Sequence, residues 1–164
     1  MDKAGIVFPH QLFEQNVLTS SCSRIYLVEE RLFFRHYHFH KRKIAFHRAG
    51  MKFYEQYLLS KKIEVVYVEA FDELADVRKL IPHLKSKGVH SIEYIDTSDC
   101  WLEQRVKTAA ATQGMDLLKH ESPMFLNSQA ANAAFFSDRK RMFQTDFYKQ
   151  QRQSRNILME NRNT

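Results

Sequence analysis

Short apolar runs rich in β-branched residues recur along the chain, and most are separated by stretches in which apolar residues follow the period of a helix. The apolar runs are AGIVF (4–8), RIYLVE (24–29), IEVVYVE (63–69), SIEYI (91–95) and MDLLK (115–119). The helical stretches cover residues 41–60, 73–87 and 99–113. Strands that alternate with helices predict an α/β fold, an open and mainly parallel five-stranded sheet with helices on both faces.

The stretch 41–60 has an apolar face that should pack against the sheet. This face consists of Ile44, His47, Met51, Tyr54 and Leu58, and the opposite side consists of Lys41, Arg48, Lys52 and Glu55. His47 is the titratable member of the apolar face. It is interpreted either as a hydrogen-bonded structural residue or as a ligand contact.

A helix that follows a strand begins at the strand's carboxyl end, which is the edge where open α/β sheets bind ligands. We therefore expect His40, Lys41 and His47 to face a crevice at this edge. The partial positive charge of the helix N-terminus adds to that of Lys41, which suits an anion or an electron-rich ring. Glu29 and Glu30 end the second strand at the same edge, where one of them orients a ligand or caps a neighbouring loop.

The last part of the chain changes in character. Residues 122–138 carry few charges and no clear period, which predicts a long loop packed on the domain. Residues 139–164 predict a basic helix with Phe143, Phe147, Ser154 and Leu158 on one side. We therefore divide the chain into an α/β domain over 1–138 and a C-terminal basic helix over 139–164. That helix contacts either nucleic acid or a neighbouring domain.

The 164 residues, 44% of them hydrophobic, suffice for one compact domain with its own core. The net charge of +6 is uneven, because residues 31–48 hold six Lys or Arg and no acid, and residues 139–164 hold seven against two acids. Such stretches attract phosphates or an acidic surface, or they form a solvated face. Two cysteines, no apolar run of about 20 residues and no signal peptide indicate a reduced, cytoplasmic protein with no membrane partner.

Several common sites have no counterpart in the sequence. The turn after the first strand, PHQLF, lacks the glycines of a dinucleotide or P-loop site, and no G-x-S-x-G motif supports a hydrolase. His36, His38 and His40 alternate as three metal ligands would in an extended segment. However, they lie among Arg35, Lys41 and Arg42, so we favour a polar loop between the second strand and its helix.

Four stretches taken in order resemble a known family. VFPHQLF, LVEERLFFRHYHFHKRKIAFHRAGMKFY, IEYIDTSDCWLEQRV and MFQTDFYKQQRQSRNILME are similar to the N-terminal part of the deoxyribodipyrimidine photolyase-related proteins, which are iron–sulfur bacterial cryptochromes and photolyases. The most specific part is the motif matched by His40, Lys41, Lys43 and Ile44. The resemblance spans nearly the whole chain.

This resemblance implies a Rossmann-like N-terminal domain that packs against a larger helical domain. In the family, the helical domain holds FAD and an iron–sulfur cluster and uses blue light for DNA repair or for signalling. We therefore expect this chain to be one part of a longer protein, with no flavin, cluster or lyase activity of its own. The C-terminal FAD domain is the expected partner, and DNA is a partner of the full-length protein.

The resemblance also implies an antenna chromophore, a lumazine, at the carboxyl edge of the sheet. The family's acid after the first strand is replaced here by His10, its pigment-contacting glutamate by Phe33, and a small apolar residue by His47. Either the pigment differs, as a flavin-like ring stacked on Phe33 would, or the domain is structural. The cofactor-binding residues expected are His10, Gln11, Glu29, Phe33, His40, Lys41, Ile44 and His47. The alternative function is a basic nucleic-acid-binding module with no chromophore.

Overall fold

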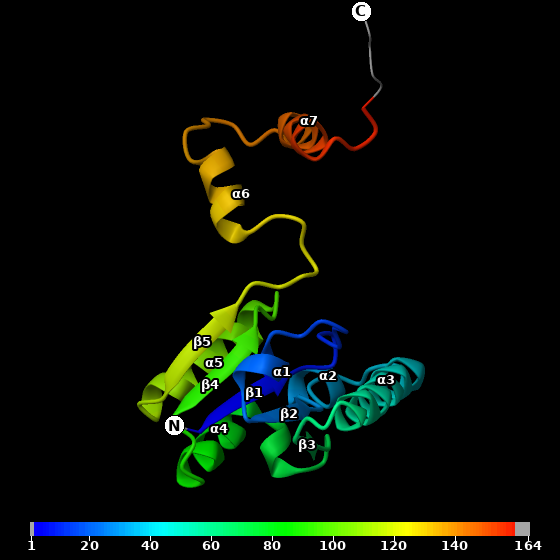
Figure 1. Ribbon diagram of the computed structural model, residues 1–164, viewed down its shortest axis with the longest axis vertical. Helices are drawn as coiled ribbons and strands as arrows, with labels where there is room; N and C mark the ends of the chain where they lie inside the picture. The colour runs from blue at the N-terminus through cyan, green and yellow to red at the C-terminus, as the bar shows by residue number, and fades with distance from the viewer. Residues whose placement is uncertain (1, 160–164) are drawn as a thin grey trace, which may run out of the picture. The chain divides into compact units, whose positions relative to one another are not determined.

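The computed structural model describes residues 2–159 and contains a five-stranded parallel sheet in the order β3-β2-β1-β4-β5. The strands are β1 (Lys3–Val7), β2 (Arg24–Val28), β3 (Val65–Val68), β4 (Ser91–Ile95) and β5 (Asp116–His120). Their arrowheads point to one end of the sheet (Figure 1). The predicted α/β fold class is confirmed, and each predicted strand is present with small shifts at its ends.

Most of the connecting helices begin at an identifiable N-cap. The helices of the α/β part are α1 (Leu18–Ser21), α2 (Arg31–Phe34), α3 (Lys41–Ser60), α4 (Val77–Ser86) and α5 (Cys100–Thr112), with a 3₁₀ turn η1 (Glu73–Ala75). The predicted stretch 73–87 is divided because Asp72 caps η1 and Asp76 caps α4. The bounds predicted for α3 are confirmed.

Two apolar layers fix the helices to opposite faces of the sheet. Ile6, Tyr26 and Tyr94 pack with residues of α4 and α5, such as Leu80 and Val106. On the other face, Leu18 of α1 and the α3 side chains Met51, Tyr54 and Leu58 pack against Val7, Ile25 and Leu27. Alternate residues of a strand point to opposite faces, which is why β1 and β2 contribute to both layers.

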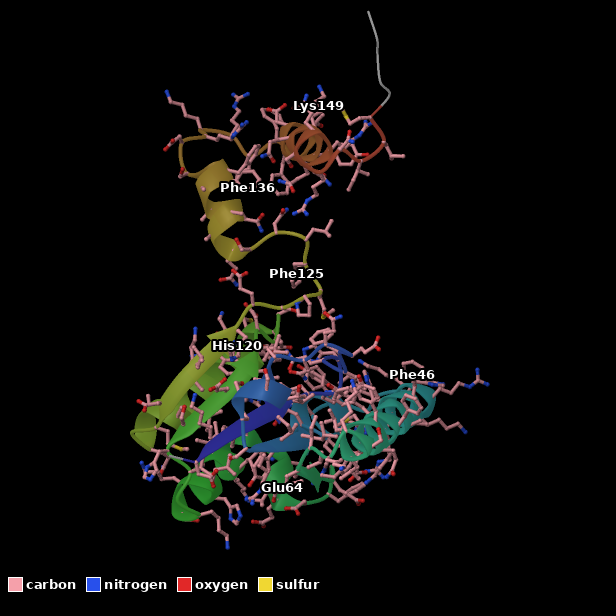
Figure 2. The ribbon with its side chains drawn as sticks, viewed as in Figure 1. Phe46, Glu64, His120, Phe125, Phe136 and Lys149 are labelled. Carbon is pink, nitrogen blue, oxygen red and sulfur yellow. The ribbon has the colours of Figure 1, made fainter. Side chains whose placement is uncertain are left out.

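The chain divides into two compact units between Ser122 and Pro123. The second unit contains α6 (Gln129–Phe136) and α7 (Gln144–Arg155), and none of the residues in these helices is buried. In this unit the Phe147 ring centroid lies 5.0 Å from that of Phe135 and 5.2 Å from that of Phe136. Figure 2 labels Phe136 on α6 and Lys149 on α7.

Two expectations for this unit were wrong. Residues 122–138 include the helix α6, whose first turn is capped by the Ser128 hydroxyl accepting from the Ala131 amide at 3.0 Å. Its residues are mostly Ala and Phe, with Gln129 and Asn132 as the polar ones, so the contrast between polar and apolar positions was too weak to show a helical period. Leu158 lies beyond α7, because Asn156 ends the helix in the left-handed region with φ of 52°. The functional division at 138/139 stays a prediction.

Across residues 2–159, no helix is both long and apolar enough to cross a membrane.

Candidate functional site

The turn after β1 joins the carboxyl ends of β1 and β4. The Gln11 amide nitrogen donates to the carbonyls of Ile95 at 2.9 Å and Asp96 at 3.0 Å, and this side chain is buried. The His10 Nε2 lies 2.9 Å from the carbonyl of Thr97. From β1 the strand order runs to one side through β2 and β3 and to the other side through β4 and β5. The turn therefore lies at the switch point between β1 and β4, where open α/β sheets bind ligands.

Each of these two side chains has a buried polar atom that finds no hydrogen-bond partner within residues 2–159, namely His10 Nδ1 and Gln11 Oε1. Because the His10 Nε2 faces a carbonyl, it carries the ring proton and Nδ1 is an acceptor. Burial lowers the pKa of His10, against the effect of the Thr97 carbonyl, so the ring is neutral near pH 7. The turn therefore contains two buried acceptor atoms without a hydrogen-bond donor among the described residues.

Aromatic side chains surround this turn. The His10 ring centroid lies 5.0 Å from that of Phe33, which packs against both apolar layers at the edge of the sheet. Beyond α2, the His36 ring contacts Tyr37 at 4.5 Å and Trp101 at 6.1 Å. Residues of the β1 turn, of α2 and of the start of α5 thus meet at the carboxyl edge.

His47 of α3 lies close to the same turn. Its ring is half-buried, 6.2 Å from that of Phe34, and it interacts with the backbone of Pro9. Burial and the charge of Lys43 lower the pKa of His47, so it too is neutral near pH 7. His10, Gln11, Phe33 and His47 are therefore brought together by the fold.

Glu29 is an anchor inside the protein. Its carboxylate is completely buried and accepts from Arg48 Nε at 2.7 Å and from Arg48 Nη2, from the Tyr67 hydroxyl at 2.7 Å and from the Ala70 amide at 2.8 Å. Burial alone would raise the pKa of Glu29, but these donors outweigh it and hold the pKa below its ordinary value. The capping role considered for this pair of glutamates is the one observed.

Glu30 is also buried but has weaker partners. It accepts from the amides of Val77 at 3.0 Å and Leu32 at 3.4 Å, and its carboxylate lies 3.8 Å from Arg105 Nη1. Burial, together with the charge of Asp76, raises the pKa of Glu30 to about 7. Glu30 therefore links the N-termini of α2 and α4. Its carboxyl group releases its proton only near neutral pH.

The remaining predicted residues lie along the first turn of α3. His40 is exposed and caps the helix, because its Nδ1 accepts from the Arg42 amide at 3.2 Å. Lys41 is exposed, and Ile44 packs against the apolar layer beneath α3. His36, His38 and His40 lie in the loop 35–40, and no group of three metal-binding side chains comes together within the described residues.

The sequence interpretation missed Trp101, His36 and Tyr37 as part of this edge. It also missed a polar cavity of about 350 Å³ at the ends of β2 and β3, which Arg31, Arg35 and Phe71 line. The helix α5 begins with Cys100 and Trp101, just after β4, in the same way as α3 begins with Lys41 after β2. The rule that a helix starts at the carboxyl end of the preceding strand placed His40 at this edge, and it applied to Trp101 as well. The Arg35 guanidinium lies 5.1 Å from the Phe71 ring centroid.

Two comparisons relate this chain to known proteins. The family model of the deoxyribodipyrimidine photo-lyase-related proteins matches residues 5–164. An uncharacterized protein of Acanthamoeba polyphaga mimivirus is 28% identical over 171 residues, which cover 98% of this chain and 86% of the viral protein. The family match includes the carboxyl edge and both structural units.

Proposed function

This chain belongs to the family of deoxyribodipyrimidine photolyase-related proteins, and on that basis we propose that its α/β unit binds a planar antenna chromophore at the carboxyl edge of the sheet. The observation that supports the proposal is the pair of unpartnered buried acceptors, His10 Nδ1 and Gln11 Oε1, beside the ring of Phe33. Leaving a buried acceptor unpaired costs about 1–3 kcal/mol. A ligand that donates to both atoms removes this cost.

The side chains at this edge suit a lumazine or a flavin-like ring. Phe33 offers a surface for stacking, and the two acceptors suit ring N–H or ribityl hydroxyl groups. Glu29 holds β2, β3 and α3 in place, so its function at the site is to position these elements.

When bound, the chromophore would absorb light and pass excitation energy to a flavin. We propose that this flavin belongs to a helical FAD domain that packs against the α/β unit, and that an iron–sulfur cluster lies in that same domain. The chain's own residues fix the position and orientation of the ring, which determine the efficiency of energy transfer. The whole protein then acts in DNA repair as a lyase or in cryptochrome-type signalling.

Titration of the 164-residue chain with a ribityl-lumazine and with riboflavin tests the proposal, with induced circular dichroism in the ligand's absorption band as the readout. We expect a saturable signal that is lost in Phe33→Ala, and an affinity weakened about fivefold in Gln11→Leu, since one charge-neutral hydrogen bond contributes about 1 kcal/mol. Phe53→Ala is the matched control, because Phe53 lies exposed on α3. A signal that is absent, or equal in Phe33→Ala and the control, would refute the edge site.

The alternative of a basic nucleic-acid-binding module is not favoured. Within the basic stretch, Arg48 binds the buried Glu29 and Lys43 lies 4.4 Å from the Phe39 ring centroid. Such cations are engaged within the protein and are less available for phosphates. A duplex titration at two salt concentrations separates the functions, because binding through phosphates falls steeply with salt.

A further inference from the structure

A groove between α4 and α5 forms a second cavity, which the proposed chromophore site does not use. It encloses about 530 Å³, within the usual range for small-molecule sites. Its lining residues are Arg78, Pro82, Trp101, Gln104, Arg105, Thr108, Ala109, Thr112 and Gln113. Both helices cover the same face of the sheet, so the groove opens on the outside of that layer.

Two arginines, Arg78 and Arg105, line the groove. Within the described residues, none of the side chains that line it is acidic. The Arg78 guanidinium is neutralised by Asp76, with Nε and Nη2 at 2.9 and 2.5 Å from its carboxylate oxygens. Arg105 is different, because it pairs with Glu30 only at 3.8 Å, between Nη1 and the nearest carboxylate oxygen, and this Nη1 has no hydrogen-bond partner within the described residues. Because Nη1 is buried beside Glu30, an anion in the groove would accept from the other N–H groups of Arg105, which lines the groove.

An aromatic ring and polar groups accompany this donor. Trp101 lies one helical turn before Arg105 and is 53% exposed, although its ring also contacts His36. Gln104, Thr108 and Gln113 add amide and hydroxyl groups along the groove. A guanidinium, an indole ring and neutral polar groups in one cavity match the three parts of a nucleotide.

We propose that the α4–α5 groove binds a nucleoside monophosphate, with the base on Trp101, the phosphate on Arg105 and the ribose against Thr108 and Gln104. The size of the cavity fits one nucleotide. A single available guanidinium donor fits one phosphate better than a chain of phosphates, which would require further cations or a glycine-rich loop. This inference does not depend on the chromophore proposal, because Arg105, Thr108 and Gln104 lie outside the residues assigned to the chromophore. Trp101 is the residue of the groove that also borders the carboxyl edge, through its contact with His36.

Trp101 is the one tryptophan of the 164 residues, so its fluorescence reports on the groove directly. Adenosine 5′-monophosphate should quench this fluorescence saturably, and isothermal calorimetry should give the same affinity. Arg105→Gln should weaken binding about tenfold or more, because hydrogen bonds to charged groups are the stronger class. Lys107→Gln is the matched control, since it removes one charge from an exposed site of α5 that does not line the groove.

Two further measurements separate the parts of the site. Adenosine and inorganic phosphate should each bind more weakly than the nucleotide. If adenosine bound as tightly as the nucleotide, the assignment of the phosphate to Arg105 would be overturned. If phosphate did so, the assignment of the base to Trp101 would be overturned. Thr108→Tyr fills the groove from an exposed position and should abolish binding even if Arg105→Gln fails to fold. Equal weakening by Lys107→Gln and Arg105→Gln would overturn the proposal. Binding that is lost in Phe33→Ala but kept in Thr108→Tyr would also overturn it, by moving the nucleotide to the edge of the sheet.

Discussion

Glu29 and Glu30 are neighbours in the chain and both are buried, yet their carboxyl groups have opposite pKa shifts. Glu29 receives a guanidinium, a phenol and a backbone amide, and these donors stabilise its charged form. Glu30 receives two backbone amides and a guanidinium at 3.8 Å, which do not compensate for burial. One carboxyl is thus fixed as an anion, and its neighbour titrates near neutral pH.

Arg48→Met should destabilise the protein by roughly 2–3 kcal/mol, because the Glu29 charge stays buried without its main partner. Urea denaturation measures this change. The control is Arg24→Met, which breaks the pair with Glu64 at the start of β3 (Figure 2). Both members of that pair are exposed, so the cost should be below about 1 kcal/mol. Equal costs for the two variants would contradict the anchoring role of Glu29.

The stability of the protein should fall between about pH 5 and pH 7 through Glu30. The folded state keeps this proton up to a pKa of about 7, whereas the unfolded chain releases it near the ordinary value of 4.5. Folding therefore loses on the order of 3 kcal/mol of stabilisation as the pH rises through this window, and none beyond it. Urea denaturation at several pH values should show that Glu30→Gln lacks this decrease. If the free energy of unfolding of Glu30→Gln fell with pH as much as that of the unchanged protein, the role of Glu30 in this decrease would be refuted.

The different roles of Glu29 and Glu30 could not be predicted from the sequence. Both were placed at the carboxyl edge, and loop capping was one of the two alternatives considered. The partners that separate them come from Arg48, Tyr67 and Arg105, which lie on three other elements. Tertiary contacts between distant residues, and not local pattern, decide such pKa values.

At the scale of elements, α3 shows how one helix serves two environments. Its inner face buries Met51, Tyr54 and Leu58, while Phe46 and Phe53 stand on its outer face and are mostly exposed. Figure 2 labels Phe46 on α3. Half-buried His47 lies at the border between these faces, which explains why a pattern of apolar spacing included it.

Met51→Ala should cost about 2–4 kcal/mol, because Met51 is fully buried and a cavity would remain. Phe53→Ala on the same helix removes a larger side chain but should change stability by less than about 0.5 kcal/mol, because Phe53 is 77% exposed. Thermal or urea denaturation of both variants tests the orientation of α3. A greater cost for Phe53→Ala would show that the outer face is covered.

Elements with a strong local signal were predictable, and elements without one were not. The strands and α3 alternate or repeat their apolar residues against one core, so pattern and fold agree. In α6 six of the eight residues are Ala or Phe, and none of the eight is buried, so there was little periodic contrast to detect. At the candidate site, His10 and Phe33 followed from the family resemblance, and the rule that a helix begins at the carboxyl end of the preceding strand would also have placed Trp101 at this edge. Its contact with His36 required the tertiary structure.

At the scale of the whole molecule, the two units differ in how they are stabilised. The α/β unit has two apolar layers around a continuous sheet. The helices of the second unit bury no side chain, and Met142, Phe143 and Leu158 in it are exposed. Stability of the chain therefore resides mainly in residues up to Ser122.

A chain that ends at Ser122 should keep the cooperative unfolding transition of the longer chain. Since α6 and α7 contribute no buried side chain, the midpoint should move by only a few degrees. Calorimetry on the two chains measures this. Loss of the cooperative transition would show that residues after Ser122 complete the core.

The amide of Ala70 lies after the end of β3, where loop amides normally exchange with solvent quickly. Here it donates at 2.8 Å to the Glu29 carboxylate. This hydrogen bond breaks only if Arg48 and Tyr67 also separate from Glu29. Its deuterium uptake should therefore be as slow as that of the central strands, through global unfolding alone. The loop that borders the carboxyl edge would then be already in its final conformation before any ligand arrives, so that binding orders few residues and loses little entropy.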